Sequence, residues 1–157
     1  MDTIIEKSIQ DFTDSEIAFE YKRRFSVCEN KPVMQNSRAV KEHLRIMFGN
    51  LEQDREHFIC VFLDGQNKII RSEVLFTGSL TTSAVYPREV VKKVLQYEAG
   101  AVIFGHNHPS GSLTPSSSDR AVTKKLQTAC GSIDVEVLDH IIIAGEGSFS
   151  FADHRLI

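Results

Sequence analysis

The sequence has few cysteines and no long hydrophobic run. Its three cysteines, Cys28, Cys60 and Cys130, are an odd number without CxxC spacing, which indicates reduced thiols rather than a disulfide framework. The longest apolar stretches, such as residues 101–104 and 141–144, are far shorter than the roughly 18 residues that begin to predict a membrane span. The N-terminus also lacks the basic segment of a signal peptide. We therefore expect a cytoplasmic protein that is not secreted and has no membrane partner.

An excess of positive charge is also missing. The 157 residues include 18 Lys and Arg against 21 Asp and Glu, which gives a formal net charge of -3. Such a balance offers no basic surface for neutralising phosphates, so we do not expect this domain alone to bind nucleic acid. The hydrophobic fraction of 41% is typical of globular proteins, and the length suits one domain around one core.

The first 31 residues differ from the rest. They are rich in charge and contain Thr13-Asp14-Ser15-Glu16, which fits a capping box that opens a helix through about Phe25. Pro32 then begins a new unit. The sequence therefore predicts a helical N-terminal extension at residues 1–31, followed by the main domain at residues 32–157.

Helical and strand patterns alternate through the main domain. This alternation predicts a single α/β domain in which helices cover a mixed sheet. Expected inward positions include Ile70 and Val74 on a strand, and Val94 and Leu95 on a helix. Helices are predicted at residues 37–48, 87–99 and 116–129, and strands at residues 58–63, 68–76, 77–85, 101–104, 135–144 and 148–151.

Candidate metal ligands follow the predicted strand at residues 101–104. His106 and His108 are separated by one residue at a strand end, so their side chains project to the same face. Asp119 stands at the first turn of the next helix, and the loop before it can return its carboxylate to the imidazoles. Two histidines and one acid are a ligand class of catalytic zinc, with a fourth position for water. We therefore predict one zinc ion on these residues; the alternative is two partly exposed loop histidines.

The residues alone do not identify which acidic side chain would transfer protons at such a site. Glu56 is one of several charged residues in the segment 52–56, where a solvated surface carboxylate is the ordinary interpretation. Glu73, within a predicted strand, is a second candidate. A zinc nucleobase deaminase is excluded because the H-x-E and P-C-x-x-C signature is missing.

The order of the motifs resembles the JAB/MPN metalloprotease superfamily with its JAMM motif, and most closely the RadC-like branch. A glutamate precedes one apolar strand, H-x-H-P follows another, and Ser-x-x-Asp opens a helix. The resemblance covers the chain from about Met34 to its end and implies a three-layer domain with a curved mixed sheet. The segments that carry it are Glu56-His57-Phe58, Val61-Phe62-Leu63-Asp64, Phe76-Thr77-Gly78, Tyr86-Pro87-Arg88-Glu89, Gly105-His106-Asn107-His108-Pro109-Ser110-Gly111, Pro115-Ser116, Asp119 and Asp139-His140.

The resemblance implies a role for each matching residue. His106, His108 and Asp119 would ligate zinc. Glu56 would move the proton of a metal-activated water, and Ser116 would donate a hydrogen bond to the developing oxyanion. The implied activity is hydrolysis of an amide bond in a peptide or protein substrate, as a peptidase or isopeptidase. The alternative is a non-catalytic, protein- or DNA-associated binding module of the RadC type.

Some features of the histidines and their neighbours are less specific. Asp139 and His140 enter an apolar strand, where hydrogen-bonded structure is the ordinary interpretation and support of the metal ligands is a further hypothesis. His43, His57 and His154 have no motif around them and are expected at the surface or in packing.

Two features set this chain apart from better-studied relatives. Asn107 stands where deubiquitinating members usually have Ser or Thr, although Asn resembles the RadC-like pattern. Ubiquitin-type substrates are therefore not assumed. RadC-like proteins often carry an upstream helix-hairpin-helix region, and residues 1–31 are too short and too acidic to supply one.

Overall fold

Five strands form one mixed sheet in the order β2-β1-β3-β4-β5. β3 and β4 are parallel, and the other neighbouring pairs are antiparallel. The computed structural model describes residues 13, 15–17, 19, 33–34, 36–78 and 85–157. The strands are β1 Glu56–Leu63, β2 Ile69–Gly78, β3 Ala101–Asn107, β4 Glu136–Ala144 and β5 Gly147–Ser150, and the helices are α2 Ser37–Gly49, α3 Pro87–Gln96 and α4 Ser117–Gly131.

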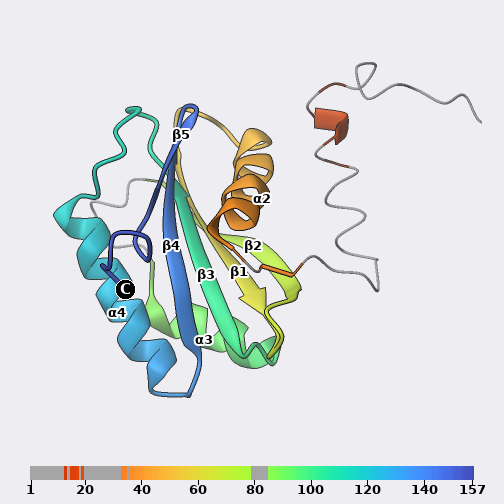
Figure 1. The fold of residues 1–157 in the computed structure, drawn as a ribbon, viewed down its shortest axis with the longest axis vertical. Coiled ribbons are helices and arrows are strands. Elements are labelled where there is room, and N and C mark those ends of the chain that lie inside the picture. The colour runs from red at the N-terminus through yellow and green to blue at the C-terminus, as the bar shows by residue number, and fades with distance from the viewer. Residues whose placement is uncertain (1–12, 14, 18, 20–32, 35, 79–84) are drawn as a thin grey trace, which may run out of the picture.

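Helices cover both faces of the sheet, as Figure 1 shows. On one face, α2 packs its buried residues Val40 and Leu44 against apolar side chains of β1 and β3. On the other face, α3 and α4 pack against alternate residues of the same strands, through side chains such as Val94 and Leu126. The predicted three-layer α/β domain with a mixed sheet is therefore confirmed.

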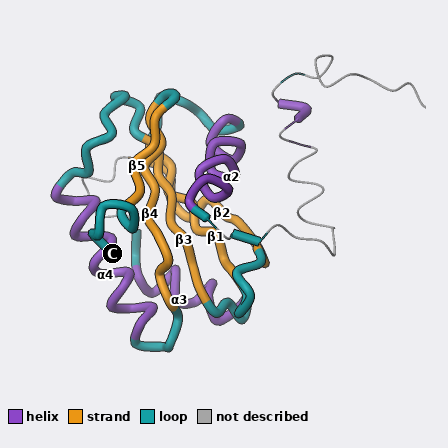
Figure 2. Tube along the Cα trace, viewed as in Figure 1, coloured by secondary structure: helices purple, strands orange, loops and turns teal. Residues whose placement is uncertain are grey.

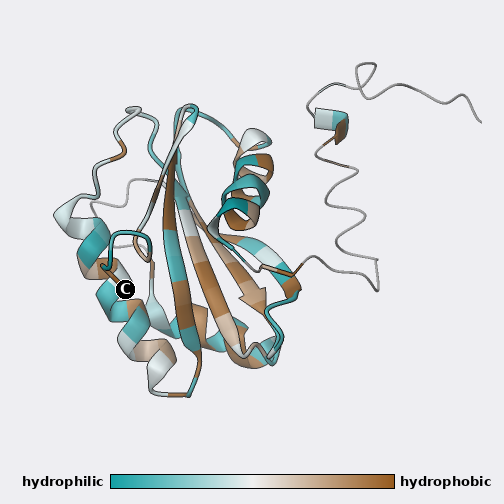
Figure 3. Cartoon of the chain, viewed as in Figure 1, coloured by the Kyte–Doolittle hydropathy of each residue, from teal (hydrophilic) through white to brown (hydrophobic). Residues whose placement is uncertain are grey.

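The central strands are buried on both sides. Every residue of β3 is buried, and so is every residue of β1 except the first. A strand that is covered on both faces has apolar residues at successive positions instead of alternating apolar and polar residues. This explains the sequence FICVFL in β1. Figure 3 shows this as hydrophobic colouring along the central strands, with hydrophilic residues on the outer sides of the helices.

Helix α3 is shorter than the sequence predicts. It ends at Gln96 instead of Ala99, and Glu98 adopts a left-handed backbone conformation with φ of 52° that turns the chain toward β3. The prediction that Leu95 points inward was wrong, because its exposed fraction is 63%. Val90 and Val94 occupy the buried stripe, and the residue after Val94 lies about 100° farther around the helix axis.

Strand β2 also departs from the expected pattern. Ile70 packs against the core, but Val74 is 37% exposed, so its predicted inward position was wrong. The register between β1 and β2 shifts opposite Ile70, between Phe62 and Leu63. Val74 pairs with Ile59 and so lies on the opposite face of the sheet from Ile70. The predicted strand at residues 77–85 is observed only as the end of β2, since residues 79–84 lie outside the described part of the chain.

Little of the N-terminal extension is described. Thr13 and Glu16 form the reciprocal bonds of a capping box: the Glu16 carboxylate accepts from Thr13 N at 2.9 Å, and the Thr13 hydroxyl accepts from Glu16 N at 3.3 Å. The rest of the predicted helix to Phe25 lies mostly outside the described residues, and the boundary at residues 31–32 stays a prediction. Among the described residues, no helix has the length and apolar character needed to cross a membrane.

Candidate metal centre

The end of β3 and the start of α4 bring three ligand groups together. His106 is the penultimate residue of β3, His108 follows the strand, and Asp119 lies in the first turn of α4. The loop over residues 108–116 connects the two elements and is visible between them in Figure 2. One ligand atom from each of the three residues lies within 4.8 Å of the others. The predicted cluster is therefore present and can hold a metal ion.

The separations between these atoms suit a small cation. His106 Nε2 lies 3.3 Å from Asp119 Oδ1, and His108 Nε2 lies 3.5 Å from Asp119 Oδ2. Ligands about 2.0–2.1 Å from a tetrahedral zinc are roughly 3.3–3.4 Å from one another. The two histidine Nε2 atoms lie closer, at 2.8 Å, which is within hydrogen-bond distance.

His108 presents the correct nitrogen to the cluster. Its Nδ1 lies 2.7 Å from the carbonyl oxygen of Ser112, and a carbonyl can only accept a hydrogen bond. The hydrogen of a neutral His108 ring is therefore on Nδ1. This leaves the Nε2 lone pair directed toward Asp119 and available to a cation.

The capping box of α4 fixes the position of Asp119. The Ser116 hydroxyl accepts from Asp119 N at 3.0 Å, and Asp119 Oδ2 accepts from Ser116 N at 2.7 Å. Ser116 is thus the N-cap of α4, as its residue type favours. Its hydroxyl uses oxygen for the cap and retains its hydrogen as a donor group, so capping does not exclude a catalytic role.

The cluster perturbs the protonation of its own members. Burial lowers the pKa of His106, with Asp119 acting in the opposite direction. Contact with Asp119 raises the pKa of His108. Burial alone would raise the pKa of Asp119, but its contacts with the two rings outweigh burial and hold that pKa well below its usual range. Asp119 is therefore a carboxylate at neutral pH, the form that binds a cation.

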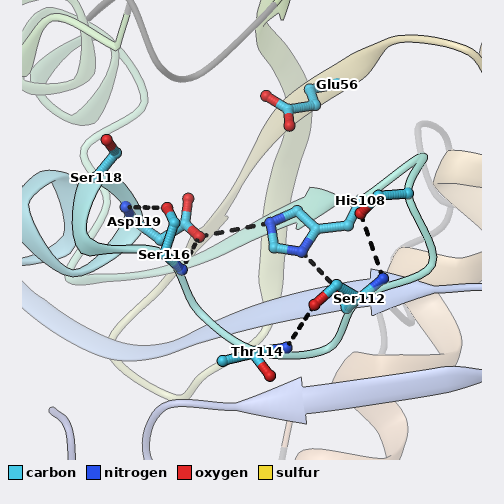
Figure 4. A pocket seen from close by; sticks show the side chains of 8 residues that line it. Glu56, His108, Ser112, Thr114, Ser116, Ser118 and Asp119 are labelled. Atoms are coloured by element: carbon cyan, nitrogen blue, oxygen red, sulfur yellow. Dashed lines mark hydrogen bonds and ion pairs between the residues drawn. The ribbon is translucent and has the colours of Figure 1, made fainter.

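Strand pairing places Glu56 beside the cluster. β1 pairs with β3 so that Phe58 lies opposite His106, and continuing this antiparallel register by two residues brings Glu56 opposite His108. Glu56, His108 and Asp119 line the same cavity, and the Glu56 carboxylate faces it in Figure 4. The pairing of β1 with β3 therefore brings Glu56 to the same cavity as two of the candidate ligands.

Asn107 connects the two strands at this point, a function that the sequence did not predict. Its Oδ1 accepts from the backbone N–H of His57 at 2.7 Å, and its Nδ2 donates to the carbonyl of Arg55 at 2.8 Å. These groups flank Glu56 on both sides. The side chain between the two histidines therefore holds the backbone that carries Glu56.

A second buried hydrogen-bond network contacts His106 through Nδ1, the ring nitrogen that does not face Asp119. His106 Nδ1 lies 2.8 Å from His140 Nε2, and His140 Nδ1 lies 2.6 Å from the hydroxyl of Thr123. Burial keeps the pKa of His140 well below its ordinary value. The Asp139 carboxylate accepts hydrogen bonds from the Ser150 hydroxyl and from the backbone N–H groups of His140 and Ala152, so it joins β4 to the C-terminal turn.

The remaining candidates lie elsewhere. The Glu73 carboxylate accepts from the Tyr97 hydroxyl and pairs with Lys93 at 3.0 Å, and it is not among the residues that line the cavity. His43 and His57 are buried packing residues, whereas His154 is exposed.

Hydroxyl groups dominate the wall of the cavity. Its volume is about 250 Å³, and among the residues that the structure describes, no lysine, arginine or large apolar side chain lines it. Figure 4 shows Ser112, Thr114 and Ser116 along the loop below and beside His108, and Ser118 at the start of α4. The lining residues are Glu56, His108, Ser110, Ser112, Thr114, Ser116, Ser118 and Asp119.

Comparison with known proteins identifies several relatives. A protein from Pseudoalteromonas translucida (strain TAC 125), UPF0758 protein PSHAa2643, is 45% identical over 130 residues, which cover 83% of this chain and 57% of the relative. UPF0758 protein YeeS of Escherichia coli (strain K12) is 45% identical over 122 residues, or 78% of this chain and 81% of the relative. A UPF0758 protein of Leptothrix cholodnii (strain ATCC 51168 / LMG 8142 / SP-6) is 42% identical over 147 residues, or 92% of this chain and 65% of the relative.

The chain thus spans somewhat less than two thirds of the length of two of these relatives. A family model described as a RadC-like JAB domain matches residues 34–156, which include all the strands and helices β1–β5 and α2–α4. This match also contains the three candidate ligands and Glu56. The chain therefore belongs to the RadC-like JAB domain family.

Proposed function

We propose that this protein is a zinc-dependent hydrolase of amide bonds, acting as a peptidase or isopeptidase. The observation that carries the proposal is a buried cluster of two histidines and one aspartate that opens into a cavity also lined by Glu56. The names of the relatives state no activity. The support for the proposal therefore comes from the residues of the site.

The donor set fits zinc. Histidine nitrogen and carboxylate oxygen are both zinc ligands, and three protein ligands are the number found in catalytic rather than structural zinc sites. His106, His108 and Asp119 would hold the ion from β3 and α4. A bound zinc ion lowers the pKa of a coordinated water toward about 7 and polarises a carbonyl group.

Glu56 is suited to proton transfer at this site. Its carboxylate faces the cavity from β1, and the bonds from Asn107 to the backbone on either side hold its position. In the proposed reaction Glu56 accepts a proton from the attacking water and passes it to the leaving amine. Ser116, across the cavity, would donate its hydroxyl hydrogen to the oxyanion that forms on the substrate carbonyl.

The cavity also limits the substrate. Apart from Glu56, His108 and Asp119, the described lining residues present small hydroxyl groups, which suit a peptide segment with small or polar side chains next to the cleaved bond. Two carboxylates in the site, Glu56 and Asp119, disfavour acidic side chains there. We therefore propose a peptide or protein substrate that presents such a segment.

Replacing the proposed base tests the chemistry separately from metal binding. We expect Glu56→Gln to keep the zinc content of the wild type but to lower kcat/KM by about 10²–10⁴-fold, because the amide cannot accept the proton. Zinc content is measured by mass spectrometry of the purified protein. Activity is measured on quenched fluorescent peptides and on isopeptide-linked peptide pairs.

Glu52 provides the matched control. Its side chain is 64% exposed and pairs with Arg55 at 3.4 Å, so Glu52→Gln should leave zinc content and activity unchanged. Full zinc occupancy with no cleavage by the wild type would reject the hydrolase and leave a metal-containing binding module.

A further inference from the structure

A chain of buried polar groups leads from the backbone of α4 to His106. The Thr123 hydroxyl lies 2.6 Å from the carbonyl oxygen of Asp119, one helical turn earlier, and also 2.6 Å from His140 Nδ1. His140 Nε2 then lies 2.8 Å from His106 Nδ1. Thr123, His140 and His106 are 2%, 1% and 0% exposed, so water does not substitute for any of these contacts.

The hydrogens along this chain are not independent. A hydroxyl has one hydrogen, a neutral imidazole has one N–H, and a carbonyl has none. If the Thr123 hydroxyl donates to the Asp119 carbonyl, His140 Nδ1 must donate to Thr123. His140 Nε2 is then an acceptor, and His106 Nδ1 must donate to it.

The result of this arrangement is a lone pair on His106 Nε2, the atom 3.3 Å from Asp119 Oδ1. The reversed arrangement, with the Thr123 hydrogen directed at His140, places a hydrogen on His106 Nε2. That hydrogen would occupy the position that a cation needs. The direction of the Thr123 hydroxyl is therefore coupled to the tautomer of His106. In the reversed arrangement the hydrogen on His106 Nε2 points toward His108 Nε2, 2.8 Å away, instead of leaving a lone pair for a cation.

We propose that Thr123 and His140 are positioning residues that set the metal-binding tautomer of His106. This inference rests on the proposed metal site. It also gives α4 two connections to that site: the carboxylate of Asp119 contacts the cluster directly, and its backbone carbonyl acts through Thr123. A histidine whose second nitrogen is held by a fixed partner is a better ligand because its ring orientation and tautomer are already selected.

Removing the Thr123 hydroxyl tests the proposal through metal affinity. Thr123→Val keeps the shape of the side chain but leaves His140 Nδ1 without this partner, and we expect zinc to bind about 10–100-fold more weakly. Thr123→Ser, which restores the hydroxyl, should recover most of the affinity. Dissociation constants are measured by competition with a fluorescent chelator.

Thr128→Val is the control on the same helix. Its hydroxyl also donates to the carbonyl four residues earlier, that of Lys124, at 3.0 Å, but it is exposed and contacts no histidine. We expect wild-type zinc affinity from this variant. Equal zinc affinity of Thr123→Val and Thr128→Val would overturn the proposal.

A measurement on the wild type does not depend on how the variants fold. In the zinc-loaded protein labelled with ¹⁵N-histidine, we expect His140 to carry its hydrogen on Nδ1 and His106 to carry its hydrogen on Nδ1. The opposite tautomer of His140 in the NMR spectrum would overturn the proposal.

A third variant separates this inference from the proposed function. If His106→Ala binds zinc as tightly as the wild type, the metal site fails and the proposed hydrolase fails with it. If His106→Ala loses zinc while Thr123→Val binds it normally, only the role of Thr123 and His140 fails.

Discussion

Asp119 performs two tasks with one carboxylate. Its Oδ2 accepts from the backbone of Ser116 in the capping box, and the same group faces the rings of His106 and His108. Because the cap fixes the first turn of α4, the carboxylate is already oriented before a cation arrives. Less rotational entropy is then lost on binding, as for other pre-organised sites.

His43 gives a residue-scale prediction of acid sensitivity. The ring is buried in α2, with Nε2 2.8 Å from the Ser72 hydroxyl, and burial lowers its pKa to about 4. Between the unfolded value of 6.5 and about 4, the unfolded chain binds a proton that the folded chain does not, so stability falls as the pH falls. The loss should reach about 2 kcal/mol at pH 5.

Urea unfolding of wild type and His43→Gln at pH 7 and pH 5 measures this contribution. The variant is expected to lose less stability over that interval, because glutamine does not titrate. Equal losses in the two proteins would show that His43 does not contribute to acid sensitivity.

The residues of the site differ in how far the sequence reveals them. His106, His108 and Asp119 could be found because strand alternation and a helix start constrain where their side chains point. Asn107 and Thr123 could not, because their partners are set by the β1–β3 register and by the packing of α4 on β4. These contacts join residues far apart in the sequence, so no local sequence pattern predicts them.

At the scale of elements, α2 approaches β3 closely at one glycine. A Cβ built on Gly105 would lie 2.7 Å from both terminal methyl groups of Leu44, which is fully buried. This approach seats α2 against the strand that carries His106. We therefore expect Gly105→Ala to lower the free energy of unfolding by about 1–3 kcal/mol, the usual cost of overpacking.

Chemical denaturation of a double-mutant cycle checks this expectation. Leu44→Ala removes the clashing methyl groups, so adding Gly105→Ala to it should cost much less than adding it to the wild type. Gly131→Ala is the control, since a Cβ there meets no atom within 4 Å. Additive effects of the first two changes would contradict the predicted contact.

The elements themselves were easier to predict than their orientation. Capping residues and apolar spacing located α2 and α4 within two residues at each end. Leu95 and Val74 were misassigned because burial depends on which neighbour covers a face and on the shift in β1–β2 pairing. Sequence periodicity shows which residues share one face of a helix or strand, but not which neighbouring element covers that face.

For the whole molecule, a cation at the cluster would connect the sheet to the helix layer. His106 lies in β3, His108 directly follows that strand, and Asp119 belongs to α4. Zinc that binds only the folded chain stabilises it by about 4 kcal/mol when its concentration is a thousand times Kd. Removing zinc with a chelator should therefore lower Tm by about 10 °C in a protein of this size.

Scanning calorimetry with and without chelator measures the shift. The His106→Ala, His108→Ala double variant should show no chelator effect, because it lacks two ligands. A chelator effect of the same size in both proteins would place the stabilising metal elsewhere.

The proposed metal ligands and the proposed base come from separate segments of the chain. All proposed ligands and their supporting residues fall within residues 106–140, whereas Glu56 comes from a separate hairpin joined through Asn107. The proposed metal binding and the proposed proton transfer therefore depend on different segments. A change confined to the hairpin would remove the proposed base and leave all three proposed ligands unaltered.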